Sequence, residues 1–292
     1  MPSNDHLLEL SLFISAQNIR TGCEILLRKI LEDEGVASSQ IMELQDGGKV
    51  CVATYFCSRL AAERIHRQIL LKNLKNVKVQ LKHLKKEDWQ EKWKESVRPF
   101  RLTEKFDVVP AWRVKEYRRK KREPIIIDTA FAFGTGLHET TRFMSEFIEQ
   151  SEGQFIDFLD VGTGTGILSI VAYKCGARSV DALDLDAMTV KVAKENLQRN
   201  RLKFRRIGIV DFGKLKNRET YDFVAANLLS ETLILLNEKL LSRVNRGGHL
   251  AISGISLKNL KKVKETFKEK SLRCLKIKKG EKWAALLYKK TS

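Results

Sequence analysis

Hydrophobic and polar positions follow two different patterns along the chain. Between residues 7 and 82, short runs alternate apolar and polar residues, the period of half-buried strands, and two segments between them carry apolar residues at helical spacing. These runs predict strands at 8–14, 41–44, 50–56 and 77–81 and helices at 19–34 and 59–71. The resulting order, βαββαβ, predicts a small ferredoxin-like α+β domain.

From about residue 125 onward, strands alternate with helices. Strands are predicted at 155–161, 179–183, 207–210, 223–226, 250–253, 272–278 and 283–288, and helices at 189–200, 231–241 and 257–270. Such alternation predicts an α/β fold with a mostly parallel sheet covered on both faces. Only residues 279–282 separate the last two strands, so these strands must pair antiparallel. A seven-stranded Rossmann-like sheet that ends in a reversed hairpin is usual for class I methyltransferases, whereas a dehydrogenase normally continues with another parallel strand.

Between the two patterns lies a connector. Asp88 could cap a short helix that carries Trp89 and Trp93 on one face, and prolines punctuate the extended stretch after it. We therefore expect one domain at residues 1–85, a linker at 86–115 and a second domain at 116–292. The densest basic run, residues 113–122, favours a solvated loop, with a patch that faces RNA as the alternative.

The strongest chemical signal is a glycine-rich turn with the sequence FLDVGTGTG at residues 158–166. Gly162, Gly164 and Gly166 permit a tight turn and let a ligand approach the backbone, and the helix that starts at Ile167 presents N–H groups to an anion. The dinucleotide fingerprint GxGxxG would need a glycine where Ile167 stands. The spacing GxGxG instead favours the carboxylate-bearing tail of S-adenosylmethionine.

Polar residues follow the later strands at the edge where open α/β sheets bind ligands. Asp184 can accept hydrogen bonds from both ribose hydroxyls of the cofactor, whereas the nearby Asp186 is interpreted as a helix N-cap. Asn227 could accept from a substrate amine, donate to the methionine carboxylate or orient the nucleophile, with a turn residue that caps the next helix as the alternative. Asp211 is a hypothesis for the adenine amino group, with a turn aspartate as the alternative.

A second glycine-rich segment, residues 131–142, is rich in aromatic and hydroxyl side chains and precedes a helix. Such a loop can fold over a bound cofactor and exclude water. We expect Phe133 and Thr141 to contact the cofactor, although Thr141 could instead cap the helix. His138 and His249 are isolated, so no metal site is expected.

Composition narrows the class of protein. The 292 residues are 43% hydrophobic, and no run of apolar residues is long enough to span a membrane. The N-terminal residues do not resemble a signal peptide, and five cysteines without a CxxC pair suggest neither disulfides nor a zinc site, so we expect a cytosolic protein. The formal net charge of +18 favours contact with nucleic acid or with a target that lies near it, and lysines spread over solvated faces are the alternative.

These motifs together resemble a known family. The segments AFGTGLHETTR, LDVGTGTGILSIVA, LDLDAMTVKVAKENLQRN, VAANLL and RGGHLAISGI, with the connector EDWQEKWKESVRPF and the later Pro110-Ala111-Trp112, resemble the ribosomal protein L-eleven methyltransferases of the PrmA type. The resemblance spans nearly the whole chain, and the combination FGTGxHxTT with the connector tryptophans is specific. Two departures stand out: Asp128-Thr129-Ala130 replaces the family's usual Asp-Pro-Gly, and Thr163 and Thr165 stand where Cys and Ser are common.

The resemblance implies a function. It implies an enzyme that uses S-adenosylmethionine to methylate lysine side chains and the N-terminal α-amine of the large-subunit ribosomal protein L-eleven, free or on the ribosome, with incidental contact to ribosomal RNA. The N-terminal domain would recognise that protein, and the linker would let it reorient. Positions that match the family's cofactor contacts are Thr141, Gly162, Asp184 and Asn227.

Two other functions fit the same residues. One is an RNA methyltransferase of the same fold, supported by the charge of +18. The other is an RNA-binding assembly factor that does not bind the cofactor, which the intact glycine turn and Asp184 disfavour. Partition of a labelled methyl group between ribosomal protein and RNA separates the first from the protein methyltransferase, and calorimetry with S-adenosylhomocysteine tests the second.

Overall fold

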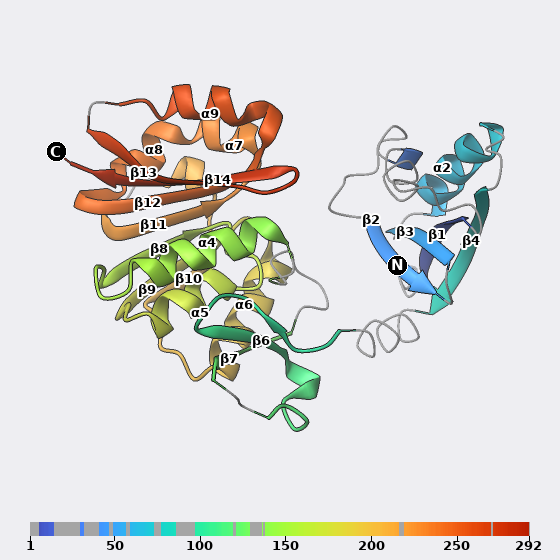
Figure 1. Ribbon diagram of the computed structural model, residues 1–292, viewed down its shortest axis with the longest axis horizontal. Coiled ribbons are helices and arrows are strands. Elements are labelled where there is room, and N and C mark those ends of the chain that lie inside the picture. Colours follow the sequence, from blue (N-terminus) through green and yellow to red (C-terminus); the bar gives the residue numbers. More distant parts are fainter. Residues whose placement is uncertain are drawn as a thin grey trace. The chain divides into compact units, whose positions relative to one another are not determined.

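The computed structural model divides the chain into two compact units, Met1–Ser96 and Val97–Ser292 (Figure 1). It describes residues 6–14, 30–31, 41–46, 49–56, 59–72, 77–85, 97–118, 121–128, 136, 138–215, 219–269 and 271–291. The domain boundaries expected after residues 85 and 115 stay a prediction. The connector tryptophans Trp89 and Trp93 lie outside the described residues.

The N-terminal unit contains a four-stranded antiparallel sheet in the order β2-β3-β1-β4. The strands are β1 (His6–Ile14), β2 (Ile41–Asp46), β3 (Lys49–Phe56) and β4 (Val77–Lys85), and α2 (Arg59–Leu71) packs on one face. Alternate residues of β1, Leu10 and Leu12, are buried against Ile65 and Ile69 of α2. The strand order is that of the predicted ferredoxin-like fold. The predicted helix at 19–34 falls mostly outside the described residues.

The larger unit is built on a seven-stranded sheet in the order β10-β9-β8-β11-β12-β14-β13. In chain order the strands are β8 (Asp157–Val161), β9 (Ser179–Asp184), β10 (Arg206–Ile209), β11 (Tyr221–Asn227), β12 (Val244–Ser256), β13 (Leu272–Lys279) and β14 (Trp283–Lys290). The first five are parallel, and β14 runs antiparallel between β12 and β13. The predicted Rossmann-like core with its reversed hairpin is therefore confirmed.

Helices cover both faces of this sheet (Figure 1). Neighbouring strand residues point to opposite faces, so Phe223 packs with one set of helices and Val224 with the other. The first set is α4 (Glu139–Gln150), α5 (Ile167–Lys174) and α6 (Ala187–Arg199). The second set is α7 (Ser230–Leu235), α8 (Asn237–Ser242) and α9 (Leu260–Thr266).

A small three-stranded sheet, not predicted from the sequence, precedes this core. It consists of β5 (Phe100–Arg101), β6 (Phe106–Pro110) and β7 (Glu123–Ile127), with β6 and β7 parallel and a short 3-10 helix, η3 (Ala111–Arg113), between them. Val108, Ile125 and Ile127 are buried in the same apolar cluster as α4 and α5. The sheet is thus part of the larger unit, and β7 leads directly into the segment that follows residue 128.

Candidate functional site

The glycine turn joins β8 to α5 as the sequence predicts. Gly162, Gly164 and Gly166 have φ angles of 74°, 57° and 81°, a region that favours glycine. The N–H groups of Gly162 and Thr163 donate to the Leu183 carbonyl at 2.8 and 3.0 Å, which holds the turn against β9. A Cβ on Gly166 would lie 2.6 Å from Leu197 Cδ1, so α6 packs directly on the turn.

Asp160, in β8, stabilises the glycine turn through side-chain hydrogen bonds. Its Oδ2 accepts hydrogen bonds from Thr163 Oγ1 at 2.8 Å and Ser169 Oγ at 2.7 Å. Its Oδ1 is buried and has no partner among the described residues. Burial raises the pKa of Asp160 to about 6, although the bonds from Ser169 and Thr163 oppose the shift. Asp160 was not predicted from the sequence as part of the site.

Asp184 ends β9 and faces the turn from the next strand. Its Oδ2 accepts from the Gly164 N–H at 3.1 Å, and its Oδ1 accepts from the N–H groups of Leu185 and Asp186 at 2.8 and 3.2 Å. A carboxylate has about four lone-pair positions, so acceptor capacity remains for a ligand. Asp186 caps α6 by accepting from the Met188 and Thr189 N–H groups at 2.6 and 3.3 Å, as predicted.

Asn227 ends β11 and meets the start of α4. Its Nδ2 donates to Thr140 Oγ1 at 3.3 Å, and this hydroxyl lies 2.7 Å from Nδ1 of His138, the N-cap residue of α4. The segment that follows the second glycine-rich loop therefore lies at the same sheet edge as the glycine turn. With Nδ2 directed to Thr140, Asn227 retains Oδ1 as an acceptor for a ligand.

Thr141 is 1% exposed, and within the described part of the chain its hydroxyl has no hydrogen-bond partner. A buried polar group without a partner costs about 1–3 kcal/mol. A ligand carboxylate that accepts from this hydroxyl would remove that cost. The orphaned hydroxyl, the half-buried glycines Gly162 and Gly164 and the free capacity of Asp184 therefore fit an amino-acid nucleoside such as S-adenosylmethionine.

Glu139 ties α4 to the C-terminal hairpin. Its carboxylate accepts from the N–H groups of Glu281, Lys282 and Trp283 at 3.2, 3.3 and 3.0 Å. The His138 and Trp283 rings meet edge to face with centroids 5.4 Å apart. The hairpin thus places an aromatic side chain beside the N-cap residue of α4, an arrangement that no local sequence pattern indicated.

Two asparagines of α6 join the site to β7. Asn200 Oδ1 accepts from the Ile126 N–H at 2.9 Å and Nδ2 donates to the Ile126 carbonyl at 2.6 Å. Asn196 does the same with Asp128, at 2.7 and 3.1 Å, and also donates to the Thr165 carbonyl of the glycine turn at 3.0 Å. Residues four apart on a helix and two apart on a strand have similar spacing, so the two amides imitate a neighbouring strand.

The positions of Asp211 and Phe133, the two other predicted site residues, leave their expected contacts with the cofactor untested. Asp211 follows β10 at the same sheet edge, where its carboxylate is 42% exposed and 3.3 Å from Lys214 Nζ. Phe133 lies outside the described residues, whereas Gly136 of the same loop is buried. A contact of either Phe133 or Asp211 with the cofactor stays a prediction.

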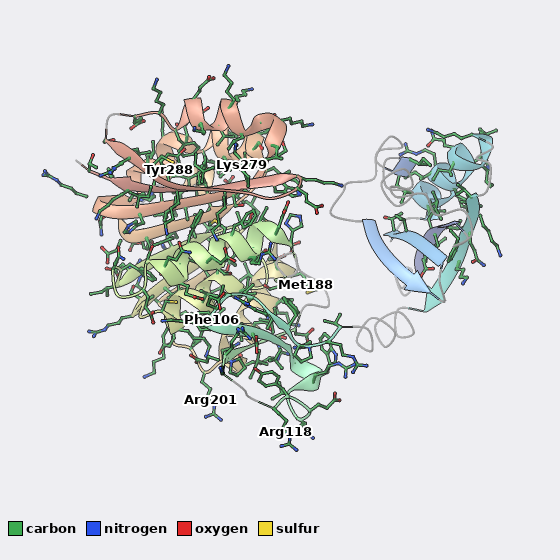
Figure 2. The ribbon with its side chains drawn as sticks, in the orientation of Figure 1. Phe106, Arg118, Met188, Arg201, Lys279 and Tyr288 are labelled. Carbon is green, nitrogen blue, oxygen red and sulfur yellow. The ribbon has the colours of Figure 1, made fainter. Side chains whose placement is uncertain are left out.

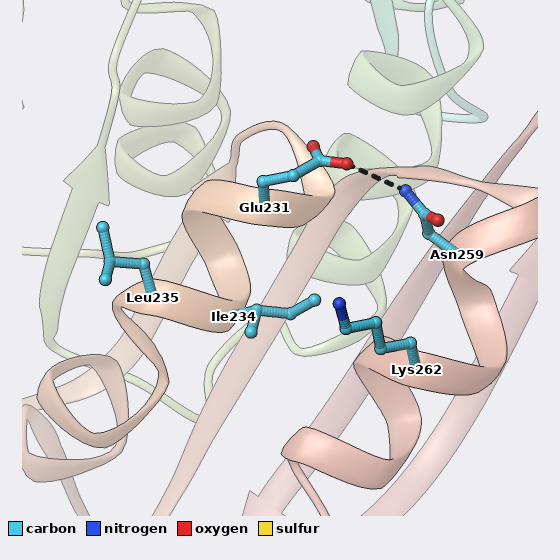
Figure 3. A pocket seen from close by; sticks show the side chains of 5 residues that line it. All are labelled: Glu231, Ile234, Leu235, Asn259 and Lys262. Carbon is cyan, nitrogen blue, oxygen red and sulfur yellow. Dashed lines mark hydrogen bonds between the residues drawn. The ribbon is translucent and has the colours of Figure 1, made fainter.

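A small cavity of about 280 Å³ lies between α7 and α9 (Figure 3). It is lined by Glu231, Ile234, Leu235, Asn259 and Lys262, with Asn259 Nδ2 donating to Glu231 at 3.1 Å. None of the predicted site residues lines it. Among the described residues no group of His, Cys, Asp and Glu is arranged to hold a metal ion, and no helix has the length and apolar character needed to cross a membrane.

Comparisons with known proteins agree with one another. A family model described as ribosomal protein L11 methyltransferase (PrmA) matches residues 15–291. The chain is 34% identical over 210 residues to a protein of that name from Staphylococcus saprophyticus subsp. saprophyticus, covering 72% of this chain and 67% of the relative. It is 36% identical over 220 residues to one from Caldanaerobacter subterraneus subsp. tengcongensis, covering 75% and 70%. The solved ribosomal protein L11 methylase from Lactobacillus delbrueckii subsp. bulgaricus has a TM-score of 0.61 at 29% identity, over 67% of this chain and 100% of that one.

Proposed function

Because the chain belongs to the ribosomal protein L11 methyltransferase family, we propose that it transfers methyl groups to lysine side-chain amines and the N-terminal α-amine of ribosomal protein L11. Its methyl donor is S-adenosylmethionine. One observation carries the assignment of the site: the glycine turn, Asp184 and the Asn227–Thr140 pair converge at one edge of the sheet. This edge is where open α/β sheets bind their ligands.

Each group of the candidate site has a proposed role in holding the cofactor. Gly162 and Gly164 let its amino-acid tail approach the turn, and the Thr141 hydroxyl donates to its carboxylate. Asp184 accepts from its ribose hydroxyls, Asp211 accepts from its adenine amino group, and Phe133 contributes apolar contact. When bound, the cofactor supplies an electrophilic methyl group on a sulfonium.

Asn227 is the residue proposed to contact the reacting amine. A lysine amine with a pKa near 10.4 is mostly protonated at pH 7, so the attacking form must lose its proton first. The Oδ1 of Asn227 can accept from the remaining N–H and direct the nitrogen lone pair toward the methyl group. The hydrogen bond from Nδ2 to Thr140 fixes which end of the amide faces the amine.

The test uses ribosomal protein L11 as substrate and intact mass as the readout. We expect the parent enzyme to add methyl groups and Asn227→Ala to lose at least about 100-fold in rate; an unchanged rate together with unchanged S-adenosylhomocysteine affinity would remove Asn227 from the site. Asp184→Ala should lose cofactor binding, and Asp186→Ala, which removes only a helix cap, should keep it. Cofactor binding by Asp184→Ala equal to that of Asp186→Ala would remove Asp184 from the site.

Ribosomes supply the second part of the test. Incubation with a labelled methyl donor, followed by separation of protein from RNA, should place the label in one large-subunit protein. Label in the RNA fraction alone would favour the RNA methyltransferase of the same fold and refute the proposed substrate. The N-terminal unit is proposed to recognise ribosomal protein L11, and a cytosolic location stays a prediction.

A further inference from the structure

A basic groove lies beside the candidate site on the larger unit. It has a volume of about 430 Å³ and is lined mainly by residues of β5, η3 and the segment before β7. Its lining residues, called the arginine groove from here on, are Arg98, Pro99, Phe100, Arg101, Asp107, Arg113, Glu116, Tyr117, Arg118 and Arg122. Five arginines thus face two carboxylates in one concave surface, and Arg118 extends outward from the unit (Figure 2).

Both carboxylates of the groove are already engaged. Asp107 Oδ2 accepts from the Tyr117 hydroxyl at 2.9 Å, and Glu116 accepts from Arg113 Nη1 at 2.8 Å. Arg113 also donates through Nε to the Val97 carbonyl at 2.8 Å, so it helps to build the groove wall. Arg101 is likewise paired with Glu104, so the positive charge that remains uncompensated lies mainly on Arg98 and Arg118.

Three arginines keep donors for a ligand. Arg98 and Arg118 are exposed and form no ion pair with any residue that the structure describes. The Nη1 of Arg122 lies 3.8 Å from Asp107 Oδ1, too far for a hydrogen bond, and its Nε is buried without a partner among those residues. A guanidinium whose donors lack protein partners is stabilised by an oxyanion that accepts two parallel hydrogen bonds, as a phosphate does.

The groove is connected to the candidate site through Phe100. A Cβ on Gly136, the described glycine of the second glycine-rich loop, would lie 3.2 Å from Phe100 Cζ and 3.1 Å from Ile167 Cδ1 at the start of α5. Exposed Lys115 and Lys121 continue the positive charge along the chain on either side of Arg118. A long polyanion, rather than one small anion, matches cations that are spread over a groove and the chain segment beside it.

We infer that the arginine groove binds the phosphate backbone of RNA next to the methylation site. The choice of RNA among polyanions rests on the proposed function, because the proposed substrate is a ribosomal protein, which itself binds ribosomal RNA. Contacts of arginine with phosphate fix position without reading sequence, so the groove provides affinity and orientation on an RNA-bound substrate. Methylation of free ribosomal protein L11 does not need it.

The test compares two charge reversals of equal size. The groove variant is Arg98→Glu/Arg118→Glu, and the control is Lys258→Glu/Lys261→Glu on exposed positions at the start of α9. Binding of a fluorescein-labelled RNA hairpin is followed by anisotropy over a series of salt concentrations. We expect the groove variant to bind at least about tenfold more weakly, with a salt slope smaller by about one to two, and the control to change less than about threefold.

Two further measurements make the outcome decisive. Arg122→Ala should weaken RNA binding without lowering the rate of methylation of free ribosomal protein L11, and all variants should bind S-adenosylhomocysteine like the parent. Equal loss of RNA affinity in the groove and control variants would overturn the inference in favour of overall charge. A raised KM for the free protein with unchanged RNA affinity would overturn it in favour of a protein-binding groove. A parent enzyme that binds RNA but methylates no protein would refute the proposed function and leave the RNA contact standing.

Discussion

At the scale of the residue, Gly166 is limited by both its backbone and its neighbour. Its φ of 81° is strained for any other residue, and a Cβ would lie 2.6 Å from Leu197 Cδ1. We expect Gly166→Ala to lower the free energy of unfolding by about 2–4 kcal/mol and to weaken S-adenosylhomocysteine binding at least about tenfold, because the turn must shift. Chemical denaturation and calorimetry measure the two effects.

Gly153 provides the matched control for this substitution. Its φ is 74°, but a Cβ there meets no atom within 4 Å. Gly153→Ala should therefore lose only the backbone contribution, about 1–2 kcal/mol, and keep cofactor affinity. An equal loss of affinity in both variants would show that the effect at Gly166 is general destabilisation.

The raised pKa of Asp160 makes a prediction about pH. Its pKa is 3.8 without burial and about 6 in the folded protein, so the folded state holds this proton more tightly than the unfolded chain. The contribution of Asp160 to stability is therefore largest below about pH 4 and falls as the pH rises through 6, by about 3 kcal/mol. Urea unfolding of the parent and Asp160→Asn between pH 4 and 7 measures this difference.

The comparison with the variant is needed because other carboxylates also contribute to the pH dependence of stability, some with the opposite sign. The pKa of Asp181 is lowered by its bonds with Arg205 and Tyr221 despite its burial, so its contribution to stability grows with pH and is complete above about pH 4. Parallel stability curves for the parent and Asp160→Asn would contradict the raised pKa of Asp160.

At the scale of the element, Asn196 of α6 and Asn200 at its C-cap allow the effect of a substitution on stability to be separated from its effect on cofactor binding. Asn196 reaches both Asp128 and the glycine turn, whereas Asn200 reaches Ile126. We expect Asn196→Ala and Asn200→Ala each to lower the free energy of unfolding by about 1–3 kcal/mol. Only Asn196→Ala should also weaken S-adenosylhomocysteine binding, by about tenfold, because only Asn196 supports the Thr165 carbonyl.

Calorimetry at a temperature well below both melting transitions provides the measurement. Equal cofactor affinity in the two variants would mean that α6 supports the glycine turn through the packing of Ala193 and Leu197 and not through Asn196. The same experiment with Asn196→Asp tests the direction of the bonds, because a carboxylate keeps the acceptor for the Asp128 N–H and loses both donors.

Periodicity predicted the strands of the main sheet because apolar strand segments alternate there with segments of helical spacing. Periodicity failed where contacts with distant parts of the chain determine the local structure. The predicted helix at 231–241 is two helices separated at Leu236, and the predicted helix at 257–270 begins as a 3-10 turn and ends at Thr266. The small sheet of β5 to β7 was missed because β5 has only two residues and β6 ends at a proline, so neither shows a strand pattern.

The same limit applies to the site. Gly162, Asp184 and Asn227 were found because each follows a recognisable strand. Asn196, Asn200 and Glu139 were not, because a polar residue on an amphipathic helix gives no local sign of a backbone partner far along the chain. The resemblance to a family supplied the substrate, which no pattern of burial or charge could name.

At the scale of the whole molecule, the division into two units predicts separate functions: cofactor binding in the larger unit and substrate recognition in the N-terminal unit. A fragment spanning Val97–Ser292 keeps the sheet, the glycine turn and the hairpin tied by Glu139. We expect it to bind S-adenosylhomocysteine within about threefold of the full chain and to lose at least about 100-fold in kcat/KM for ribosomal protein L11. Unchanged kcat/KM would show that the N-terminal unit does not recognise the substrate.

The position of β14 also constrains how the protein can be made. This strand lies between β12 and β13, so the sheet has a gap until residue 290 has been synthesised. A nascent chain must therefore keep the edges of β12 and β13 from pairing with other strands until β14 has been synthesised. A premature stop codon shortly before residue 283 should yield an aggregating product that proteases remove, rather than a shortened enzyme with partial activity.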